Sequence, residues 1–434
     1  MGQRCCGGEV DNSTRSVASL LLTATGLALV AAAPATATGG DGTSRTQTAH
    51  PVFSAEKPWV IGHRGASGHR PEHTLEAYEL AVRMGADFFE PDLVSTRDGV
   101  LVCRHENEIS GTTDVADHAE FADRRTTKTI DGVELTGWFT EDFTLAELKT
   151  LRAVERIPAE RPGNTRYDGQ FEVATFAEVL ELRERLSAET GREIGIIPEV
   201  KHPTYFDGLG LSMEEGLVEQ LRAAHLDHAD APVHVQSFEL QNLVDLNRSL
   251  GAEVPLVFLT SSEGQPWDLE SAGDPRTYAD LMKPEGLNEL ARDIDAIGPE
   301  RTLVVPEEDG VLGEPTSLVA DAHAAGLAVT PYTFRAENAF LPESLRSSQD
   351  PAELGDMDTL VRAHLEAGVD GVFSDQPGLA ATTRDAWRQE QGPVIDTGVA
   401  APAQDLPSAL PGLLAGAGAL ALGALLVRQG ARRA

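Results

Sequence analysis

The feature that most constrains the fold of this chain is a pattern that occurs four times: an amphipathic helical segment, a glycine, and then an apolar, β-rich segment. The copies read AYELAVRMGADFFEPDL around Gly85, LVDLNRSLGAEVPLVFLT around Gly251, VADAHAAGLAVTPYTF around Gly326 and VRAHLEAGVDGVFSD around Gly368. Glycine directly after a helix favours the left-handed C-cap conformation. Short connections from helices to buried strands are typical of βα repeats around a parallel sheet. The pattern therefore predicts an α/β fold.

Four further segments have the composition of buried strands, at 59–62, 194–200, 233–237 and 302–305. Together with the four repeats they give eight strands that alternate with helices. This number predicts a TIM (β/α)8 barrel, although the number of strands alone also allows a doubly wound sheet. Residues from about 106 to 176 are polar, rich in turn signals and outside the repeat. We interpret them as an insertion in the loop after the second strand.

The two ends of the chain differ in composition from this α/β body, which spans 58–388. Residues 1–37 combine basic residues, an apolar run and an Ala-x-Ala site, which is typical of a secretory signal peptide; an uncleaved anchor is the alternative. Residues 410–427 are apolar and precede a basic tail at 428–434, which predicts a C-terminal transmembrane segment. Linkers at 38–57 and 389–409 complete the chain. We therefore expect an extracellular, cell-surface protein anchored in the plasma membrane by its C-terminus.

Charge and cysteine content narrow the range of partners. The sequence has 69 acidic and 35 basic residues, a formal net charge of −34. Such an excess of negative charge argues against general binding of nucleic acid or of anionic lipid. Cys103 is the one cysteine outside the predicted signal peptide, so we expect no internal disulfide and a small buried side chain at this position. No oligomeric state is predicted.

Chemically active residues gather at the ends of the predicted strands, where TIM barrels form their active sites. They are, in chain order, His63 and Arg64 after the first strand, Glu90 and Asp92 after the second, His105 after the next extended segment, and Glu199 and Lys201 after the third. Because side chains alternate along a strand, two residues separated by one position are expected to point to the same side. Glu90 and Asp92 are therefore expected to point to one side of their strand, and Glu199 and Lys201 to one side of theirs.

Three of these residues, Glu90, Asp92 and Glu199, offer oxygen ligands that suit Ca²⁺ or Mg²⁺ and not zinc, which favours histidine and thiolate. The two histidines are able to act as general acid and general base near neutral pH. The arginine and the lysine supply positive charge for an anionic group, most simply a phosphate. A metal site, two cations and an acid–base pair together indicate hydrolysis of a phosphodiester.

The motifs around these residues resemble those of the glycerophosphodiester phosphodiesterase family. The family segment that runs from His-Arg-Gly to Pro-Glu-Asn-Thr corresponds to HRGASGHRPEHT, its Glu-x-Asp to EPDL, and the segment with its second histidine to VLVCRHENEIS. EVK, QSF and GVDGVFSDQPG are similar to later strands, and TIDGVELTGWFTEDFTLAELKTL resembles the periplasmic or secreted bacterial subgroup. The resemblance extends from about 60 to 379. His73 replaces the family's Asn, Glu106 its usual Asp, and Phe334 the Trp of many members.

The resemblance implies a TIM barrel that hydrolyses glycerophosphodiesters to glycerol 3-phosphate and an alcohol with the help of a divalent metal, Ca²⁺ or Mg²⁺. Carried over by position, it implies an acid–base pair, His63 and His105; metal ligands, Glu90, Asp92 and Glu199; and substrate contacts, Arg64, Lys201 and Phe334. Direct attack by water and attack by the substrate's own 2-hydroxyl are both compatible with these residues.

Two other functions remain as alternatives. The same chemistry could trim glycerol phosphate units from teichoic acid or act as a phospholipase-type lyase, which the predicted surface anchor would suit. A protein of another class, a non-enzymatic surface binding protein, could use the same barrel. Loss of a catalytic residue would favour that reading, and none of the seven strand-end residues is missing.

Overall fold

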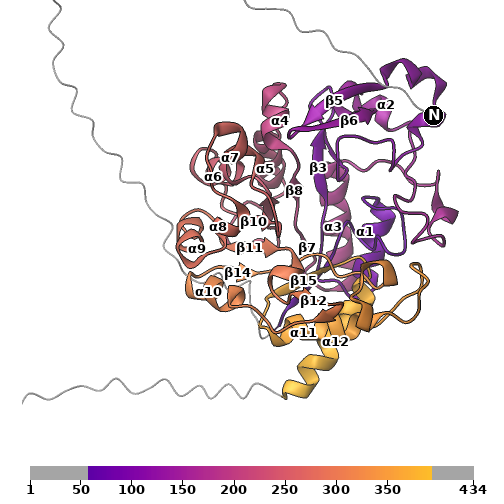
Figure 1. Ribbon diagram of the computed structural model, residues 1–434. Coiled ribbons are helices and arrows are strands. Elements are labelled where there is room, and N and C mark those ends of the chain that lie inside the picture. The colour runs from indigo at the N-terminus through magenta and orange to yellow at the C-terminus, as the bar shows by residue number, and fades with distance from the viewer. Residues whose placement is uncertain (1–56, 393–434) are drawn as a thin grey trace, which may run out of the picture. The chain divides into compact units, whose positions relative to one another are not determined.

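The structure is a computed structural model, and it describes residues 57–392. These residues form a closed barrel of eight parallel strands, drawn in Figure 1 with the helices around it. The strands are β1 (Trp59–Gly62), β2 continued by β3 (Phe88–Phe89, Asp92–Ser95), β7 continued by β8 (Gly195–Ile196, Glu199–Val200), β9 (Val235–Ser237), β10 (Leu256–Thr260), β11 (Ala296–Pro299), β14 (Ala328–Val329) and β15 (Gly371–Ser374). The predicted TIM barrel is confirmed.

Hydrogen bonding between the strands closes the cylinder. One sheet has the order β15-β1-β2-β7, and a second runs β14-β11-β10-β9-β8-β3 before ending on the short strand β4 (Leu101–Cys103). Parallel bridges between Ile196 and Val233 and between Phe334 and Ser374 join the two sheets on either side. The second and third barrel strands are interrupted at Pro91 and Pro198, because proline has no N–H to donate to the ladder.

Each barrel strand is followed by a helix that packs outside it. These helices are α1 (Leu75–Arg83), α3 (Phe176–Thr190), α5 (Glu214–Ala223), α6 (Leu240–Arg248), α9 (Pro284–Leu290), α10 (Leu318–Ala324), α11 (Met357–Glu366) and α12 (Pro377–Gln391), with the short helices α4 (Pro203–Gly208), α7 (Trp267–Ala272) and α8 (Tyr278–Leu281) in the loops. The four repeat glycines all have positive φ, between 60° and 106°, which confirms their predicted position after a helix.

The segment from 106 to 176 is an insertion between the second barrel strand and α3, as its composition predicts. It contains a hairpin of β5 (Thr126–Ile130) and β6 (Val133–Gly137), the short helix α2 (Leu145–Leu148) and several single 3-10 turns. The hairpin turns at Asp131 and Gly132, whose φ values of 47° and 77° are those of a tight hairpin turn. Figure 1 places this hairpin at the same end of the barrel as β3.

Three sequence-based expectations differ from the structure or lie outside it. The predicted strand at 302–305 is wrong: the sixth strand is β11, and Arg301–Leu303 forms a 3-10 turn. Val304 and Val305 are nevertheless buried, so their apolar character reflects core packing and not a strand. Helix α12 continues to Gln391, past the expected domain end at 388. The predicted signal peptide, the first linker up to residue 56, and the chain from 393 onward with its predicted transmembrane segment lie outside the described residues.

The described part of the chain contains no helix that is both long and apolar enough to cross a membrane. Cys103 is fully buried in β4, as expected. The hydrophobic cluster that contains Cys103 also contains residues of the barrel strands, of α3 and of the insertion, among them Leu93, Phe176 and Phe143. The barrel and its inserted segment therefore share one hydrophobic core.

Candidate active site

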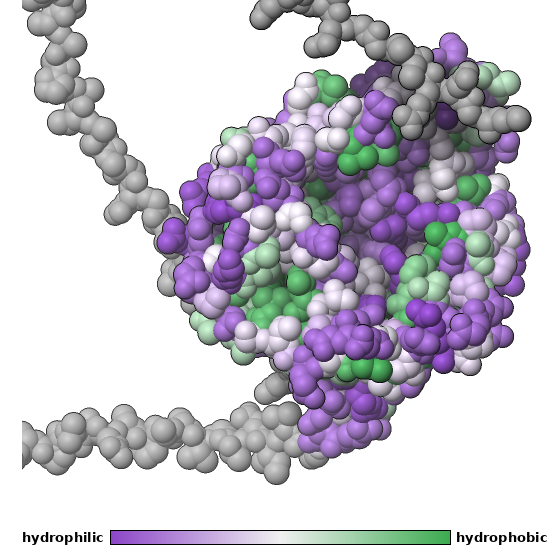
Figure 2. Space-filling model, viewed as in Figure 1, coloured by the Kyte–Doolittle hydropathy of each residue, from purple (hydrophilic) through white to green (hydrophobic). Residues whose placement is uncertain are grey.

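All of the predicted site residues except Phe334 meet at the carboxyl ends of the first three barrel strands. Figure 2 shows the surface of this face hollowed, with hydrophilic residues in the hollow. A pocket of about 220 Å³ opens beside His63 and Arg64 and reaches the insertion at Arg156 and Arg161. Parallel strands bring their carboxyl ends to one edge of a barrel, which is why residues more than a hundred positions apart in sequence become neighbours here.

The three predicted metal ligands form one compact cluster. Glu90, Asp92 and Glu199 are all buried, and each offers an oxygen within 4.8 Å of the others. Asp92 and Glu199 are paired residues on the adjacent strands β3 and β8. Glu90 lies at the interruption between β2 and β3, where it accepts hydrogen bonds from the Arg64 backbone N–H at 3.0 Å and from Gln236 Nε2 at 2.7 Å.

The electrostatics of this cluster fit a divalent cation. Burial and the negative charges of Asp92 and Glu199 raise the pKa of Glu90 well above its usual value. Burial also raises the pKa of Glu199, although Lys201 donates to its carboxylate at 2.8 Å. Burial alone would raise the pKa of Asp92 as well, but its contact with His73 and the charge of Lys201 hold it below the usual value. Asp92 Oδ1 is buried with no hydrogen-bond partner. Three hard oxygen ligands with an unsatisfied atom match Ca²⁺ or Mg²⁺.

His73, which the sequence comparison treated as a departure, supports the cluster. Its Nε2 lies 3.1 Å from Asp92 Oδ2 and its Nδ1 lies 2.9 Å from the Tyr78 hydroxyl on α1. The imidazole is completely buried. His73 therefore fixes the orientation of one carboxylate of the cluster against the first helix, as partners of metal-binding carboxylates commonly do.

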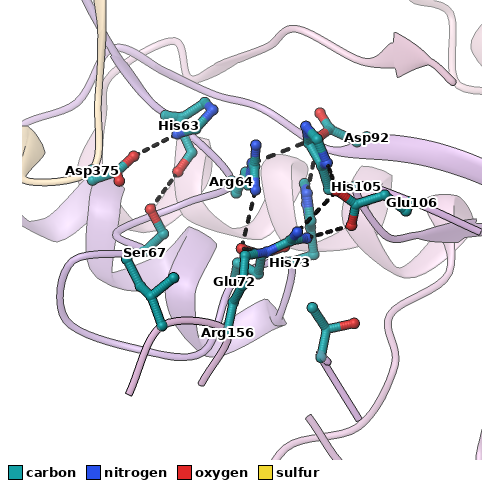
Figure 3. Close-up of polar contacts among 12 residues, drawn as sticks. His63, Arg64, Ser67, Glu72, His73, Asp92, His105, Glu106, Arg156 and Asp375 are labelled. Atoms are coloured by element: carbon teal, nitrogen blue, oxygen red, sulfur yellow. Dashed lines mark hydrogen bonds and ion pairs between the residues drawn. The ribbon is translucent and has the colours of Figure 1, made fainter. Parts of the chain in front are cut away.

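His63 is held by a carboxylate from the eighth strand. Its Nδ1 lies 2.5 Å from Asp375 Oδ1 (Figure 3). Its Nε2 lies 3.8 Å from Glu90 Oε2. An Nδ1–H that donates to a carboxylate leaves Nε2 free to accept a proton on the cluster side. Burial, only partly offset by Asp375, lowers the pKa of His63 to about 4. The imidazole is consequently neutral at pH 7 and able to act as a base.

His105 has the same arrangement on the other side of the site. Its Nδ1 lies 2.5 Å from Glu106 Oε1 (Figure 3). Its Nε2 lies 3.4 Å from Lys201 Nζ. Glu106 therefore contacts the imidazole from the position at which the family usually carries aspartate. Burial together with the charges of Arg64 and Lys201 lowers the pKa of His105 well below its usual value. An anion bound to those two cations would offset this effect.

The two predicted phosphate ligands are both buried and lie beside the carboxylates. Arg64 Nη1 is 3.2 Å from Glu72 Oε2, its Nε is 3.9 Å from Asp92, and that Nε has no hydrogen-bond partner. Arg64 and His73 adopt left-handed backbone conformations, with φ of 58° and 54°, and the His73 N–H donates to the Arg64 carbonyl. Such conformations are uncommon for residues with side chains and gather at functional sites.

The predicted substrate contact of Phe334 is not supported by its position. Its side chain is fully buried and packs edge-on against His364, with 4.7 Å between ring centres. The aromatic residues near the cluster are instead Phe238, whose ring lies 5.6 Å from Lys201 Nζ, and Tyr332, whose ring lies 5.8 Å from that of Phe238. Phe334 occupies the strand-end position but turns into the core, and strand periodicity does not reveal which way a residue turns after its strand has ended.

Residues outside the predicted set complete the site: Glu72, Glu106, Arg156, Arg161, Arg335 and Asp375. Asp375 follows the last residue of β15, so its position at a strand end was a usable signal. The two insertion arginines carry no such signal, because the segment around them has neither helical nor strand periodicity. Fold and site together define a barrel enzyme that acts on an anionic substrate.

Comparison with known proteins identifies the family. The chain matches the glycerophosphoryl diester phosphodiesterase family over residues 63–379. A glycerophosphodiester phosphodiesterase of Arabidopsis thaliana is 36% identical over 338 residues, which cover 75% of this chain and 86% of that protein. One of Haemophilus influenzae is 29% identical over 341 residues, covering 73% and 87% of the two chains. This chain belongs to the glycerophosphoryl diester phosphodiesterase family.

A solved structure agrees with this fold. A protein from Silicibacter pomeroyi that is assigned to the glycerophosphoryl diester phosphodiesterases has a TM-score of 0.54 and 22% identity, covering 78% of this chain and 95% of its own. Family membership confirms the resemblance read from the motifs and the enzyme class that it implied. The finer assignment to a periplasmic or secreted bacterial subgroup stays a prediction.

Proposed function

We propose that this protein hydrolyses glycerophosphodiesters to glycerol 3-phosphate and an alcohol, and that the reaction requires Ca²⁺ or Mg²⁺. The observation that carries the proposal is the buried cluster of Glu90, Asp92 and Glu199 between the imidazoles of His63 and His105. Three buried carboxylates this close repel one another, so a compensating cation is needed to keep all three ionised. When bound there, a divalent cation stabilises negative charge that develops on the phosphoryl oxygens.

The chain's own residues bind the phosphate and move the protons. Arg64 and Lys201 supply the positive charge that holds the phosphodiester beside the cluster, and Arg64 Nε is free to donate. His63 Nε2 accepts the proton of the attacking hydroxyl, whether from water or from the glycerol 2-position. His105 donates a proton to the departing alkoxide as its bond to phosphorus breaks. Each histidine keeps its Nδ1 on a carboxylate, so that only Nε2 exchanges protons with the substrate.

The assignment of base and acid follows from the surroundings of the two imidazoles. His63 lies 3.8 Å from a cluster carboxylate and is neutral at pH 7, as a general base requires. The pKa of His105 is lowered by burial and by Arg64 and Lys201, the same two cations proposed to bind phosphate. Bound phosphate neutralises these charges, which raises the pKa of His105 and favours the protonated, acid form in the substrate complex.

An assay with and without chelator tests the proposed reaction. We expect the purified protein to release glycerol 3-phosphate from glycerophosphocholine in the presence of Ca²⁺ or Mg²⁺. EDTA should abolish the release and excess metal should restore it, because the cluster loses its compensating charge reversibly. An unchanged rate after chelation would contradict the metal requirement. Parallel assays on teichoic acid and on a lysophospholipid cover the two alternative reactions, and turnover of these alone, or a cyclic phosphate as the final product, would overturn the proposal.

The same proposal places the protein at the cell surface, exported and tethered through 410–427. The support for this location is the composition of 1–37 and of 410–427. Both segments lie outside the described residues, so the structure adds nothing to it. Protease added to intact cells should release the barrel into the medium, and a chain truncated after 392 should be secreted. Recovery of the full chain in the cytosol, protected from protease, would contradict this location.

A further inference from the structure

The insertion contributes two arginines to the walls of the active-site pocket. Arg156 and Arg161 both line the pocket beside His63 and Arg64. They are five positions apart in one irregular segment that packs against the loop after β1: Asn164 Nδ2 donates to the Ser67 carbonyl at 3.1 Å and to Glu155 Oε2 at 2.8 Å. Neither arginine belongs to the residues proposed above to bind metal, hold phosphate or transfer protons.

Each arginine holds the carboxylate that orients one of the two histidines. Arg161 Nη2 donates to Asp375 Oδ2, while the other oxygen of Asp375 contacts His63 Nδ1. Arg156 reaches the second histidine through Glu106, because its Nη1 donates to Glu106 Oε1 at 2.9 Å and the same oxygen contacts His105 Nδ1 (Figure 3). Two parallel arginine–carboxylate–histidine chains therefore connect one inserted segment to both imidazoles.

The same arginines anchor the loop that carries the catalytic motif. Arg161 Nη1 donates to the Ser67 carbonyl at 3.1 Å and its Nε donates to Glu337 Oε1 at 2.7 Å. The Ser67 hydroxyl donates to the backbone carbonyl of His63 itself. Arg156 binds both oxygens of Glu72 in a forked contact, with Nε at 2.8 Å and Nη2 at 2.5 Å. A planar guanidinium with fixed donor directions is well suited to such forked contacts.

All three nitrogens of each guanidinium are engaged by protein acceptors. Arg64 differs, since its Nε has no hydrogen-bond partner and remains available to a ligand. We propose that Arg156 and Arg161 are positioning residues of the insertion, which align His105 and His63 by holding Glu106 and Asp375. This inference rests on the proposed phosphodiesterase reaction and assigns the insertion a role in it.

Steady-state kinetics of single variants test the inference. We expect Arg161→Met and Arg156→Met to lower kcat roughly 10- to 100-fold, as loss of residues that orient catalytic groups commonly does, and to change KM less than about 3-fold. Arg161→Lys should recover part of the loss, because it keeps the charge but not the fork. Arg166→Met is the matched control, since this exposed arginine of the same segment touches neither carboxylate.

Combination with histidine variants separates positioning from direct substrate contact. In a His63→Ala background, Arg161→Met should cost less than about 3-fold in kcat, because the imidazole through which it acts is already absent. In a His105→Ala background, Arg156→Met should likewise cost less than about 3-fold in kcat. An undiminished loss in these backgrounds, or a loss expressed in KM, would overturn the inference and assign the arginines to substrate binding.

A spectroscopic measurement keeps the inference separate from the reaction itself. In ¹⁵N-histidine-labelled full-length protein, we expect an Nδ1-protonated His63 with a strongly deshielded proton, shifted or lost in Arg161→Met and retained in Arg166→Met. This readout needs no turnover, so an inactive wild type would refute the proposed reaction while the NMR result still decides the positioning role. An unchanged His63 signal in folded Arg161→Met would overturn the role. If that variant is unfolded by circular dichroism, Arg161→Lys carries the same measurement.

Discussion

Glu90→Gln is expected to abolish catalysis while making the metal-free protein more stable. We expect kcat/KM to fall at least ~10³-fold, because a metal contributes several kcal/mol of charge stabilisation in the transition state and each 1.4 kcal/mol is worth tenfold. The rise in stability follows from the raised pKa of Glu90, whose ionised form is disfavoured by burial and by the charges of Asp92 and Glu199. A neutral amide removes that repulsion.

The glutamine fits the existing hydrogen bonds. Its carbonyl oxygen can accept from the Arg64 backbone N–H, as Glu90 Oε2 does now. Its NH2 group would meet Gln236 Nε2, but Gln236 Oε1 has no partner, so a rotation of that amide provides an acceptor. We therefore expect no folding defect, and a melting temperature that rises by roughly 2 °C for each kcal/mol of repulsion relieved.

The stabilisation of the metal-free protein by Glu90→Gln should depend on pH. Because the folded-state pKa of Glu90 is raised, the stability that this group contributes to the metal-free wild type is fully present below its usual pKa of 4.5 and is lost as the pH rises through the raised value. Glu90→Gln should lack this loss. Thermal melts of both proteins from pH 4.5 to 8, without metal and with Ca²⁺, measure this loss of stability and the stabilisation that the metal provides.

A second buried carboxylate provides the matched control. Burial raises the pKa of Glu214 on α5 to about 7, so Glu214→Gln should also stabilise the metal-free protein at neutral pH. It should, however, keep full activity and the increase in melting temperature on addition of Ca²⁺. A Glu90→Gln protein that still turns over, or that is still stabilised by metal as strongly as the wild type, would contradict the assignment of the metal site.

Replacing either histidine by alanine is expected to lower kcat by roughly 10²- to 10⁴-fold on glycerophosphocholine, the usual contribution of a general acid or base. The two variants should separate on a substrate with a better leaving group. The 4-nitrophenyl ester of glycerol phosphate releases 4-nitrophenolate, a weakly basic anion that leaves without a proton near neutral pH. His105→Ala should therefore regain most of the lost rate on this ester, whereas His63→Ala should remain slow because the attacking hydroxyl still requires a base.

Stopped assays on both substrates at matched pH provide this comparison. His234→Ala is not a suitable control because its ring packs against Trp59 and Phe88 in the barrel. His228→Ala, which changes an exposed histidine in a loop, is the control instead. Recovery of His63→Ala and not of His105→Ala on the nitrophenyl ester would exchange the two roles. Equal activity of either variant and the wild type on glycerophosphocholine would remove that residue from the reaction.

Much of the fold and of the catalytic cluster could be predicted because both depend on local pattern. The helix–glycine–strand repeat marks four of the places where a helix returns to the barrel, and its glycines do adopt positive φ. The carboxyl ends of the strands in a parallel barrel lie at one edge. The sequence alone therefore predicted that Glu90, Asp92 and Glu199 are neighbours, and they are. The prediction of a strand at 302–305 was wrong because an apolar run is buried whether or not it pairs with a neighbouring strand, so apolar character alone does not identify a strand.

Contacts between segments far apart in the chain could not be predicted from the sequence. Arg161 meets Asp375 across 214 positions, and Arg156 meets Glu72 across 84, in a segment without periodicity. Phe334 turned into the core where a substrate contact was expected, because the direction of a side chain beyond its strand depends on its packing partners, here His364.

The sequence by itself determined the barrel, the position of the inserted segment and the identity of the residues at the strand ends, since each follows from periodicity and composition along the chain. Only the tertiary structure decided which carboxylate holds which histidine, how charge is distributed within the cluster, and that the insertion closes one wall of the site. Hydrogen bonds and pKa shifts depend on distances of a few ångströms and on burial, and both are set by packing between segments that the sequence keeps far apart.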